Sequence, residues 1–245
     1  MKIYILLSLC LCLLLRGCTP NSLHATVPPI ASTETVTHQS TAPDGNLLLE
    51  RSYPRFTLTF PDARISQSIA KDLQRRIDGW MAVSADLESF ALKEYPPEKD
   101  WPLWYARLES QIMRLDATLF SVYFTYSEFT GGNHPALTTH SVTYDSQTGQ
   151  ILTLADLVEE GLPPTILSSY VNAALKPQSQ VLYDDYEALV GKAFCDGIDQ
   201  WYLSADGLCF HFAPYAIAPY SAGVITATVP YDQLNQIIRS QYLHK

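Results

Sequence analysis

Residues 201–212 read Trp201-Tyr202-Leu203-Ser204-Ala205-Asp206-Gly207-Leu208-Cys209-Phe210-His211-Phe212, and no other part of the chain specifies its architecture as strongly. Large apolar residues alternate with other residues in both arms, which is the period of a β-strand. An Asp-Gly pair between two such arms is a strong hairpin signal. With Asp206-Gly207 as the turn, Leu203 faces Phe210 and Trp201 faces Phe212 on a buried face.

Working outward from this hairpin, helices and strands are mixed along the chain. Residues 56–60 alternate as a strand does, and Asp62 precedes a long amphipathic helix. Its apolar stripe recurs at helical spacing and consists of Ile65, Ile69, Leu73, Ile77, Trp80 and Met81, continued by Leu87 and Phe90. The pattern also predicts strands at 104–113, 119–126 and 223–229, a helix between Pro163 and Pro177, and a terminal helix after Pro230.

This order of elements predicts an α+β fold, in which antiparallel hairpins pack with the long N-terminal helix and several shorter helices. We divide the chain into a signal peptide (1–17), a lipid-anchored flexible tether (18–45), an N-terminal α+β subdomain (46–138) and a C-terminal α+β subdomain (139–245).

The first 17 residues predict secretion. Lys2 precedes an apolar run from Ile3 to Leu15, which is too short to span a bilayer and fits the core of a signal peptide. The segment ending in Cys18 resembles the lipobox of bacterial lipoproteins, so we expect lipidation at Cys18. Arg16 departs from that pattern and leaves open an uncleaved anchor or cleavage a few residues further on.

Residues 19–45 are rich in Thr, Ser and Pro, and they lack apolar periodicity. Such a composition buries little surface, which predicts a flexible tether. The expected location is therefore the cell envelope, with the folded part lipid-anchored to a bacterial membrane on its periplasmic or surface face.

The charge of the chain narrows the class of partner. Removing the leader takes away Lys2 and Arg16 and no acid, so the formal net charge of -9 becomes -9 - 2 = -11. This disfavours nucleic acid and anionic membrane surfaces, which need a basic footprint, and favours cationic partners.

Of the five cysteines, only Cys195 and Cys209 fall in the folded part. In an oxidising compartment this pair predicts a disulfide, with two buried reduced thiols as the alternative. We expect no metal site and no cofactor, because neither a Cys-x-x-Cys motif nor a close His pair accompanies these residues.

Three further groups of motifs occur in a fixed order. The first is Gly131-Gly132-Asn133-His134-Pro135 with Tyr126, the second is 144–157, and the third comprises 201–208, 215–223 and 229–231. Together they resemble the extracytoplasmic domain of the anti-sigma factor RsiV and the non-catalytic region of some peptidoglycan deacetylases. This type is known as domain of unknown function 3298, with an accompanying 4163-type N-terminal part.

The resemblance implies an envelope domain that binds a ligand, which is a secreted lysozyme in the anti-sigma relative. We expect neither a sigma-factor-holding segment before the leader nor a deacetylase domain after Lys245, so only the binding module carries over. The expected partner is a lysozyme-like protein or a cell-wall glycan.

The candidate ligand-binding residues are Asn133, His134, Tyr126, Tyr215 and Tyr220. The imidazole of His134 can meet a ligand or fix its own turn through backbone carbonyls. The tyrosines can form an aromatic platform or hold the last strands together.

No hydrolase, phosphate-binding or dinucleotide-binding motif is present, so we expect a binder without catalytic residues. The acidic residues Asp184, Asp185 and Glu187 are interpreted as capping a helix. The alternative function is a peptidoglycan-modifying hydrolase, or an accessory factor of one.

Overall fold

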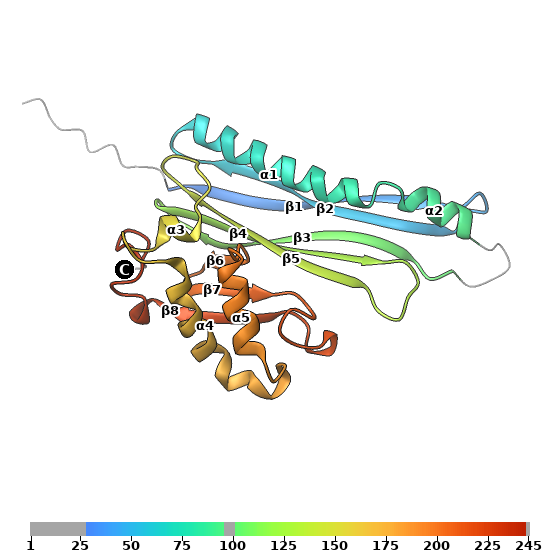
Figure 1. Ribbon diagram of the computed structural model, residues 1–245. Coiled ribbons are helices and arrows are strands. Elements are labelled where there is room, and N and C mark those ends of the chain that lie inside the picture. Colours follow the sequence, from blue (N-terminus) through green and yellow to red (C-terminus); the bar gives the residue numbers. More distant parts are fainter. Residues whose placement is uncertain (1–27, 96–100, 244–245) are drawn as a thin grey trace, which may run out of the picture.

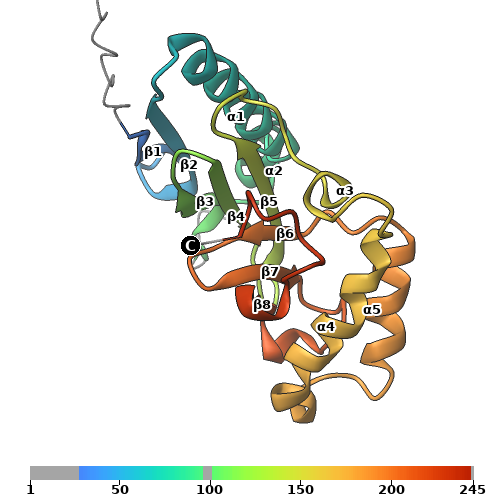
Figure 2. The same cartoon turned by 90° about the vertical axis from the view of Figure 1, so that its left-hand side faces the viewer.

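The computed structural model describes residues 28–95 and 101–243 of the 245-residue chain. Mixed helices and mainly antiparallel strands confirm the α+β class. Four layers follow one another (Figure 1, Figure 2): helices α1 (Ala63–Val83) and α2 (Leu87–Glu94), a five-stranded sheet, a three-stranded sheet, and helices α4 (Leu167–Leu175) and α5 (Tyr186–Cys195).

The five-stranded sheet follows the order of its strands along the chain. Its only parallel pair is β2 with β3, and α1 and α2 form the crossover that a parallel pair requires. The strands are β1 (Ile30–Thr41), β2 (Leu47–Thr59), β3 (Trp104–Leu115), β4 (Leu119–Phe129) and β5 (Ala136–Asp145).

Strand β1 corrects the expected tether. Residues 30–41 pair with β2 along their whole length, with one register shift between Ser40 and Thr41. Most of their side chains are exposed, so the strand is held by its backbone ladder rather than by burial. The absence of an apolar pattern is therefore no sign of disorder in this edge strand. The leader (1–17), Cys18 and the tether up to residue 27 lie outside the described residues.

The amphipathic stripe is divided between two helices. Asp62 caps α1 by accepting a hydrogen bond from the Arg64 N–H at 2.8 Å. The buried face of α1 packs on the five-stranded sheet through Ile69, Leu73, Ile77 and Met81. Helix α1 ends before Ser84, and α2 begins after a short break. In α2 the side chain of Phe90 is 53% exposed, so it does not continue the buried stripe.

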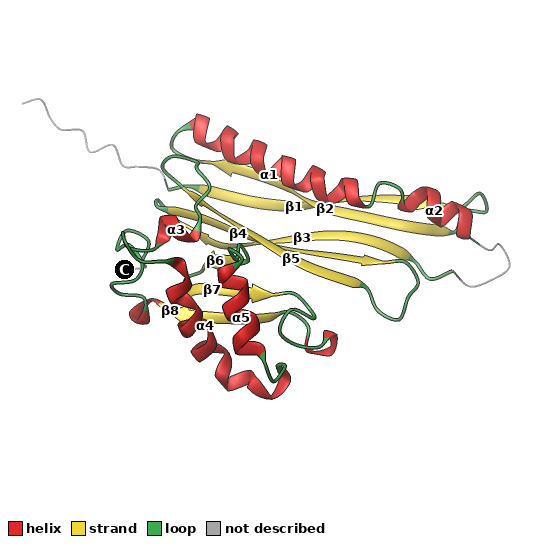
Figure 3. Ribbon diagram, viewed as in Figure 1, coloured by secondary structure: helices red, strands yellow, loops and turns green. Residues whose placement is uncertain are grey.

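The three-stranded sheet is antiparallel, and helices cover one of its faces (Figure 3). Leu208 and Phe210 lie in one hydrophobic cluster with residues of α4 and α5. Its strands are β6 (Trp201–Leu203), β7 (Gly207–Phe212) and β8 (Ile225–Pro230), and the shorter elements nearby are α3 (Leu154–Leu157), η1 (Pro164–Ile166), η2 (Lys176–Val181), η3 (Tyr220–Ala222) and η4 (Tyr231–Gln233).

The hairpin of residues 201–212 forms, but its predicted register is wrong by two residues. Leu203 pairs with Leu208 and Trp201 pairs with Phe210. The Ser204 N–H donates to the Gly207 carbonyl, so Ala205 and Asp206 are the central turn residues. Gly207 is required for another reason, since a Cβ there would lie 2.1 Å from the Val229 carbonyl oxygen of β8.

Two further expectations differ from the structure. The terminal helix does not form in the described residues after Pro230: η4 is a single short turn, and Gln236 has a φ of 69°, which interrupts a right-handed helix. The expected subdomain boundary between residues 138 and 139 falls inside β5, which pairs with β4 from Ala136 to Asp145.

Two separate hydrophobic cores result. One lies between α1 and the five-stranded sheet, and the other lies between the three-stranded sheet and α4 and α5. Between the two sheets, the face of β4 and β5 that points away from α1 meets the face of β6 and β7 that points away from α4 and α5. Many of these side chains are polar, so we call this contact the polar seam: it includes Ser121, Tyr123, Thr139, Ser141, Thr143, Tyr202 and His211.

Candidate functional site

Three of the five candidate ligand-binding residues meet in space. The imidazole of His134 stacks on the ring of Tyr220, with centroids 3.8 Å apart and planes 24° apart. The ring of Tyr215 lies 5.7 Å from that of Tyr220. These residues come from the β4–β5 loop and from the segment before β8, and we call the group the aromatic platform.

Backbone contacts fix the aromatic platform. The Tyr220 hydroxyl donates to the Pro135 carbonyl oxygen at 2.7 Å, and His134 Nδ1 lies 3.0 Å from the same oxygen. Since a carbonyl only accepts, His134 carries a proton on Nδ1. The imidazole therefore fixes its own turn while its ring stays exposed, so the two roles considered for His134 are compatible.

Tyr215 occupies a strained backbone conformation. Its φ is +71°, one of two positive values among the described non-glycine residues. Its N–H donates to the Ala218 carbonyl at 2.9 Å, and its side chain is 60% exposed. The left-handed backbone conformation of a tyrosine costs free energy, and burial of the ring does not offset this cost, because the ring is exposed. Such an outlier is typical of functional surfaces.

Glycine and amide residues shape the loop beside the aromatic platform. Gly131 has a φ of +88°, and a Cβ there would lie 3.4 Å from Trp104 Nε1. The loop thus passes within ordinary contact distance of the Trp104 indole, and the positive φ of Gly131 is what favours glycine at this position. Asn133 is exposed next to His134 and offers both an amide donor and an amide acceptor.

Tyr126 does not belong to the aromatic platform. It is 6% exposed and stacks on Trp80 of α1, with ring centroids 5.2 Å apart. Its hydroxyl donates to Glu128 Oε2 at 2.5 Å, and burial together with this carboxylate raises the Tyr126 pKa. Even-numbered residues of β4 face α1, so the sheet separates Tyr126 from Tyr220.

A polar cavity is lined by residues that flank Tyr220 in the sequence, whereas the three residues of the aromatic platform do not line it. It has a volume of about 450 Å³ and lies between the 180–184 segment and Pro219, Ser221 and Ala222, the neighbours of Tyr220. Asp184 lines it. Of the acidic cluster, Asp185 occupies the N-cap position of α5 without a side-chain capping bond, and Glu187 lies in the first turn. The platform offers aromatic faces, and the cavity offers hydrogen-bonding groups.

His211 lies at the centre of the polar seam. Its Nε2 is 2.9 Å from Ser141 Oγ, and its Nδ1 is 2.8 Å from Thr139 Oγ1. Ser141 Oγ donates its proton to the Trp201 carbonyl at 2.6 Å, so it accepts from Nε2–H, and His211 is the neutral Nε2–H tautomer. Burial, with a smaller effect of His140, lowers the His211 pKa to about 3.

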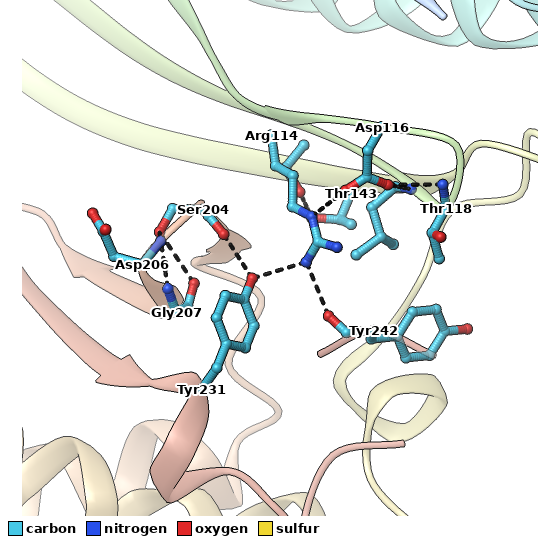
Figure 4. Close-up of polar contacts among 11 residues, drawn as sticks. Arg114, Asp116, Thr118, Thr143, Ser204, Asp206, Gly207, Tyr231 and Tyr242 are labelled. Atoms are coloured by element: carbon cyan, nitrogen blue, oxygen red, sulfur yellow. Dashed lines mark hydrogen bonds and ion pairs between the residues drawn. The ribbon is translucent and has the colours of Figure 1, made fainter. Parts of the chain in front are cut away.

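A buried arginine that the sequence did not reveal closes one end of the polar seam (Figure 4). Arg114 Nε donates to Asp116 Oδ2 at 2.6 Å, and Nη1 donates to the Tyr231 hydroxyl and the Tyr242 carbonyl, both at 2.9 Å. The Tyr231 hydroxyl donates in turn to the Ser204 carbonyl at 2.6 Å. Arg114 thereby joins the five-stranded sheet to the C-terminal segment, and this role is structural.

The expected disulfide is wrong, since Cys195 and Cys209 are both free. Cys209 Sγ lies in the polar seam, 3.4 Å from Ser204 Oγ and 3.3 Å from Thr228 Oγ1. Cys195 ends α5, whose Phe194 packs against Phe210 on the opposite face of the sheet. The three-stranded sheet therefore lies between the two thiols.

The part of the chain that the structure describes contains neither a membrane-spanning helix nor a cluster of metal-ligating side chains. None of the helices in residues 28–95 and 101–243 is long and apolar enough to cross a membrane. Within the same ranges, no three His, Cys, Asp or Glu side chains are grouped so that they could hold a metal ion.

Residues 155–232 match the family model described as "Protein of unknown function (DUF3298)". The chain is also similar to two solved structures. A DUF3298 family protein from Pseudomonas aeruginosa PAO1 is 17% identical to this chain, with a TM-score of 0.60. The similarity covers 90% of this chain and 99% of the Pseudomonas chain. A member of the same family from Bacteroides fragilis NCTC 9343 is 17% identical with a TM-score of 0.58, covering 87% and 94%.

At these identities the two structures show that the fold is shared. None of the curated proteins compared with the chain matches it. The resemblance to domain of unknown function 3298 is thus confirmed for residues 155–232, while its RsiV-like and 4163-type parts stay predictions.

Proposed function

We propose that this chain is a non-enzymatic binding module of the bacterial cell envelope, lipid-anchored through Cys18, which binds cell-wall glycan on its aromatic platform. One observation carries the proposal. Tyr215 is held exposed at a positive φ beside the stacked pair of His134 and Tyr220. An amphipathic aromatic surface next to polar groups can bind a sugar through its apolar face and its hydroxyls together.

The neighbouring groups support a glycan ligand. Asn133 is exposed next to His134 in the sequence, and the cavity of about 450 Å³ is lined by Pro219 and Ser221, the sequence neighbours of Tyr220. A cavity of this size accommodates a small ligand. The amide of Asn133 and the polar lining residues would hydrogen-bond hydroxyl and N-acetyl groups, which fixes the orientation of the ligand.

A lysozyme-like protein is the second candidate, favoured by charge. The formal net charge of the chain is -9, and complementary charge accelerates the encounter with a cationic protein. Binding of a cationic lysozyme at physiological salt should then exceed that of an acidic control protein. Equal binding of the two proteins would remove this candidate.

The glycan proposal is tested by calorimetric titration of the full chain with purified disaccharide muropeptides. We expect Tyr215→Ala to weaken binding about 10-fold or more, because truncating a central aromatic residue costs over about 1 kcal/mol. Phe90→Ala is the matched control, since Phe90 is also an exposed aromatic residue but lies on α2. Equal affinity of the wild type and Tyr215→Ala would refute the platform.

A second substitution at Tyr215 separates folding from binding. Tyr215→Gly removes the same ring but tolerates the positive φ, so it should be about 1 kcal/mol more stable than Tyr215→Ala. Urea unfolding measures this difference, and both variants should bind muropeptides equally weakly. A less stable glycine variant would show that the left-handed conformation carries no strain.

The alternative of a peptidoglycan-modifying hydrolase makes a different prediction. Prolonged incubation of the full chain with muropeptides, followed by chromatography, should return the muropeptides unchanged if the chain only binds them. New products that depend on the intact chain would replace the binder by this alternative.

A further inference from the structure

A second cavity lies at the far end of the five-stranded sheet from the aromatic platform. Its volume is about 810 Å³, within the range of small-molecule sites. It lies beside the β3–β4 turn, whereas the platform lies on the loop at the other end of β4. Its lining is mainly apolar and includes Pro28, Pro29, Phe60, Ile65, Leu115 and Ala117.

One lining residue carries an unused polar group. Ser146 follows β5 and is 4% exposed. Its N–H donates to the Thr118 carbonyl at 2.8 Å, which fixes its backbone, but its buried Oγ has no hydrogen-bond partner among the described residues. Buried hydroxyls are rarely left without a partner, because the desolvation of an unpaired group is costly.

The charges that line the cavity are matched within the protein. Asp62 accepts hydrogen bonds from the Arg64 side chain and backbone. Asp116 accepts from Arg114 and from two backbone N–H groups of the β3–β4 turn. A charged ligand would therefore be desolvated without a counter-charge of its own, and a neutral ligand is favoured.

We propose that this cavity binds a neutral, mainly apolar small molecule with one hydrogen-bonding group that meets Ser146 Oγ. The apolar walls supply affinity through burial, and the hydroxyl orients the ligand. The inference does not rest on the glycan-binding proposal, since the two sites share no residue.

The test is a fluorescence titration of the full chain with N-phenyl-1-naphthylamine, a neutral aromatic probe with a single N–H group. We expect Ser146→Ala to lower the affinity about 3- to 10-fold, the range of one hydrogen bond. Ala117→Trp should lower it at least about 10-fold by filling the cavity. Ala82→Trp, on the exposed surface near the other end of α1, is the control and should leave the affinity unchanged.

Two further measurements distinguish a ligand contact from a structural role. Thermal unfolding of Ser146→Ala without ligand should give an unchanged or slightly higher Tm, because the removed hydroxyl has no partner. The anionic probe 8-anilinonaphthalene-1-sulfonate should bind more weakly than the neutral one. The proposal is overturned if the neutral probe does not bind, if Ala117→Trp binds it as the wild type does, or if Ser146→Ala lowers Tm and leaves the affinity unchanged.

Discussion

Mild acid should destabilise the protein through His211. This imidazole is fully buried in the polar seam, and burial lowers its pKa from 6.5 to about 3. Between these two values the unfolded chain binds a proton at this residue and the folded chain does not. The free energy of unfolding therefore falls as the pH falls below 6.5, and the loss is complete only near pH 3.

The size of the effect follows from the two pKa values. Each pH unit in this window costs about 1.4 kcal/mol, so lowering the pH from 7 to 5 should cost about 2 kcal/mol. Half-buried His140 adds to the slope, because burial and Arg76 lower its pKa as well. Paired carboxylates such as Asp72 and Asp116 have pKa values lowered from 3.8, so the stability that they contribute is lost mainly below the range from pH 7 to 5.

The assay is urea unfolding at pH 7, 6 and 5, with tryptophan fluorescence as the signal that reports unfolding. His211→Gln is the comparison variant, because an amide can donate to Ser141 and accept from Thr139 as the neutral imidazole does. The variant should keep only the slope due to His140 and the remaining groups. Equal slopes in the wild type and His211→Gln would refute the assignment of the pH dependence to the polar seam.

Two further predictions concern the three-stranded sheet. Gly207→Ala should lower the free energy of unfolding in urea by about 3 kcal/mol, because its Cβ would lie 2.1 Å from the Val229 carbonyl oxygen. Gly79→Ala is the control: a Cβ there would meet no atom within 4 Å, so this change in α1 should stabilise the protein by about 0.5 to 1 kcal/mol. An unchanged stability of Gly207→Ala would contradict the close approach of β7 and β8. Exposed Cys195 should react with a maleimide in the native protein, and buried Cys209 should react only after unfolding; mass spectrometry measures both reactions. If Cys195 reacted only after a reductant was added, the expected disulfide would be supported instead.

Local chemistry along the chain was enough to predict the mixed class, the cap of α1 by Asp62, strands β3 and β4, and the hairpin of residues 201–212. These features depend on periodicity, capping and turn residues, which act over a few positions. The same reasoning failed for β1, whose exposed residues are ordered by backbone pairing with β2 rather than by an apolar pattern. It also misplaced the hairpin register, because Gly207 serves the contact with β8 and not the turn.

For the candidate site, the sequence by itself determined which residue types were available in its loops: Asn133, His134, Tyr215 and Tyr220. Only the tertiary structure decided that the last three share one surface, that Tyr126 lies across the sheet, and that Cys195 and Cys209 lie on opposite faces. The physical reason is that side chains alternate between the two faces of a strand, so a neighbour in space depends on strand pairing and register. Local sequence fixes neither of these with certainty.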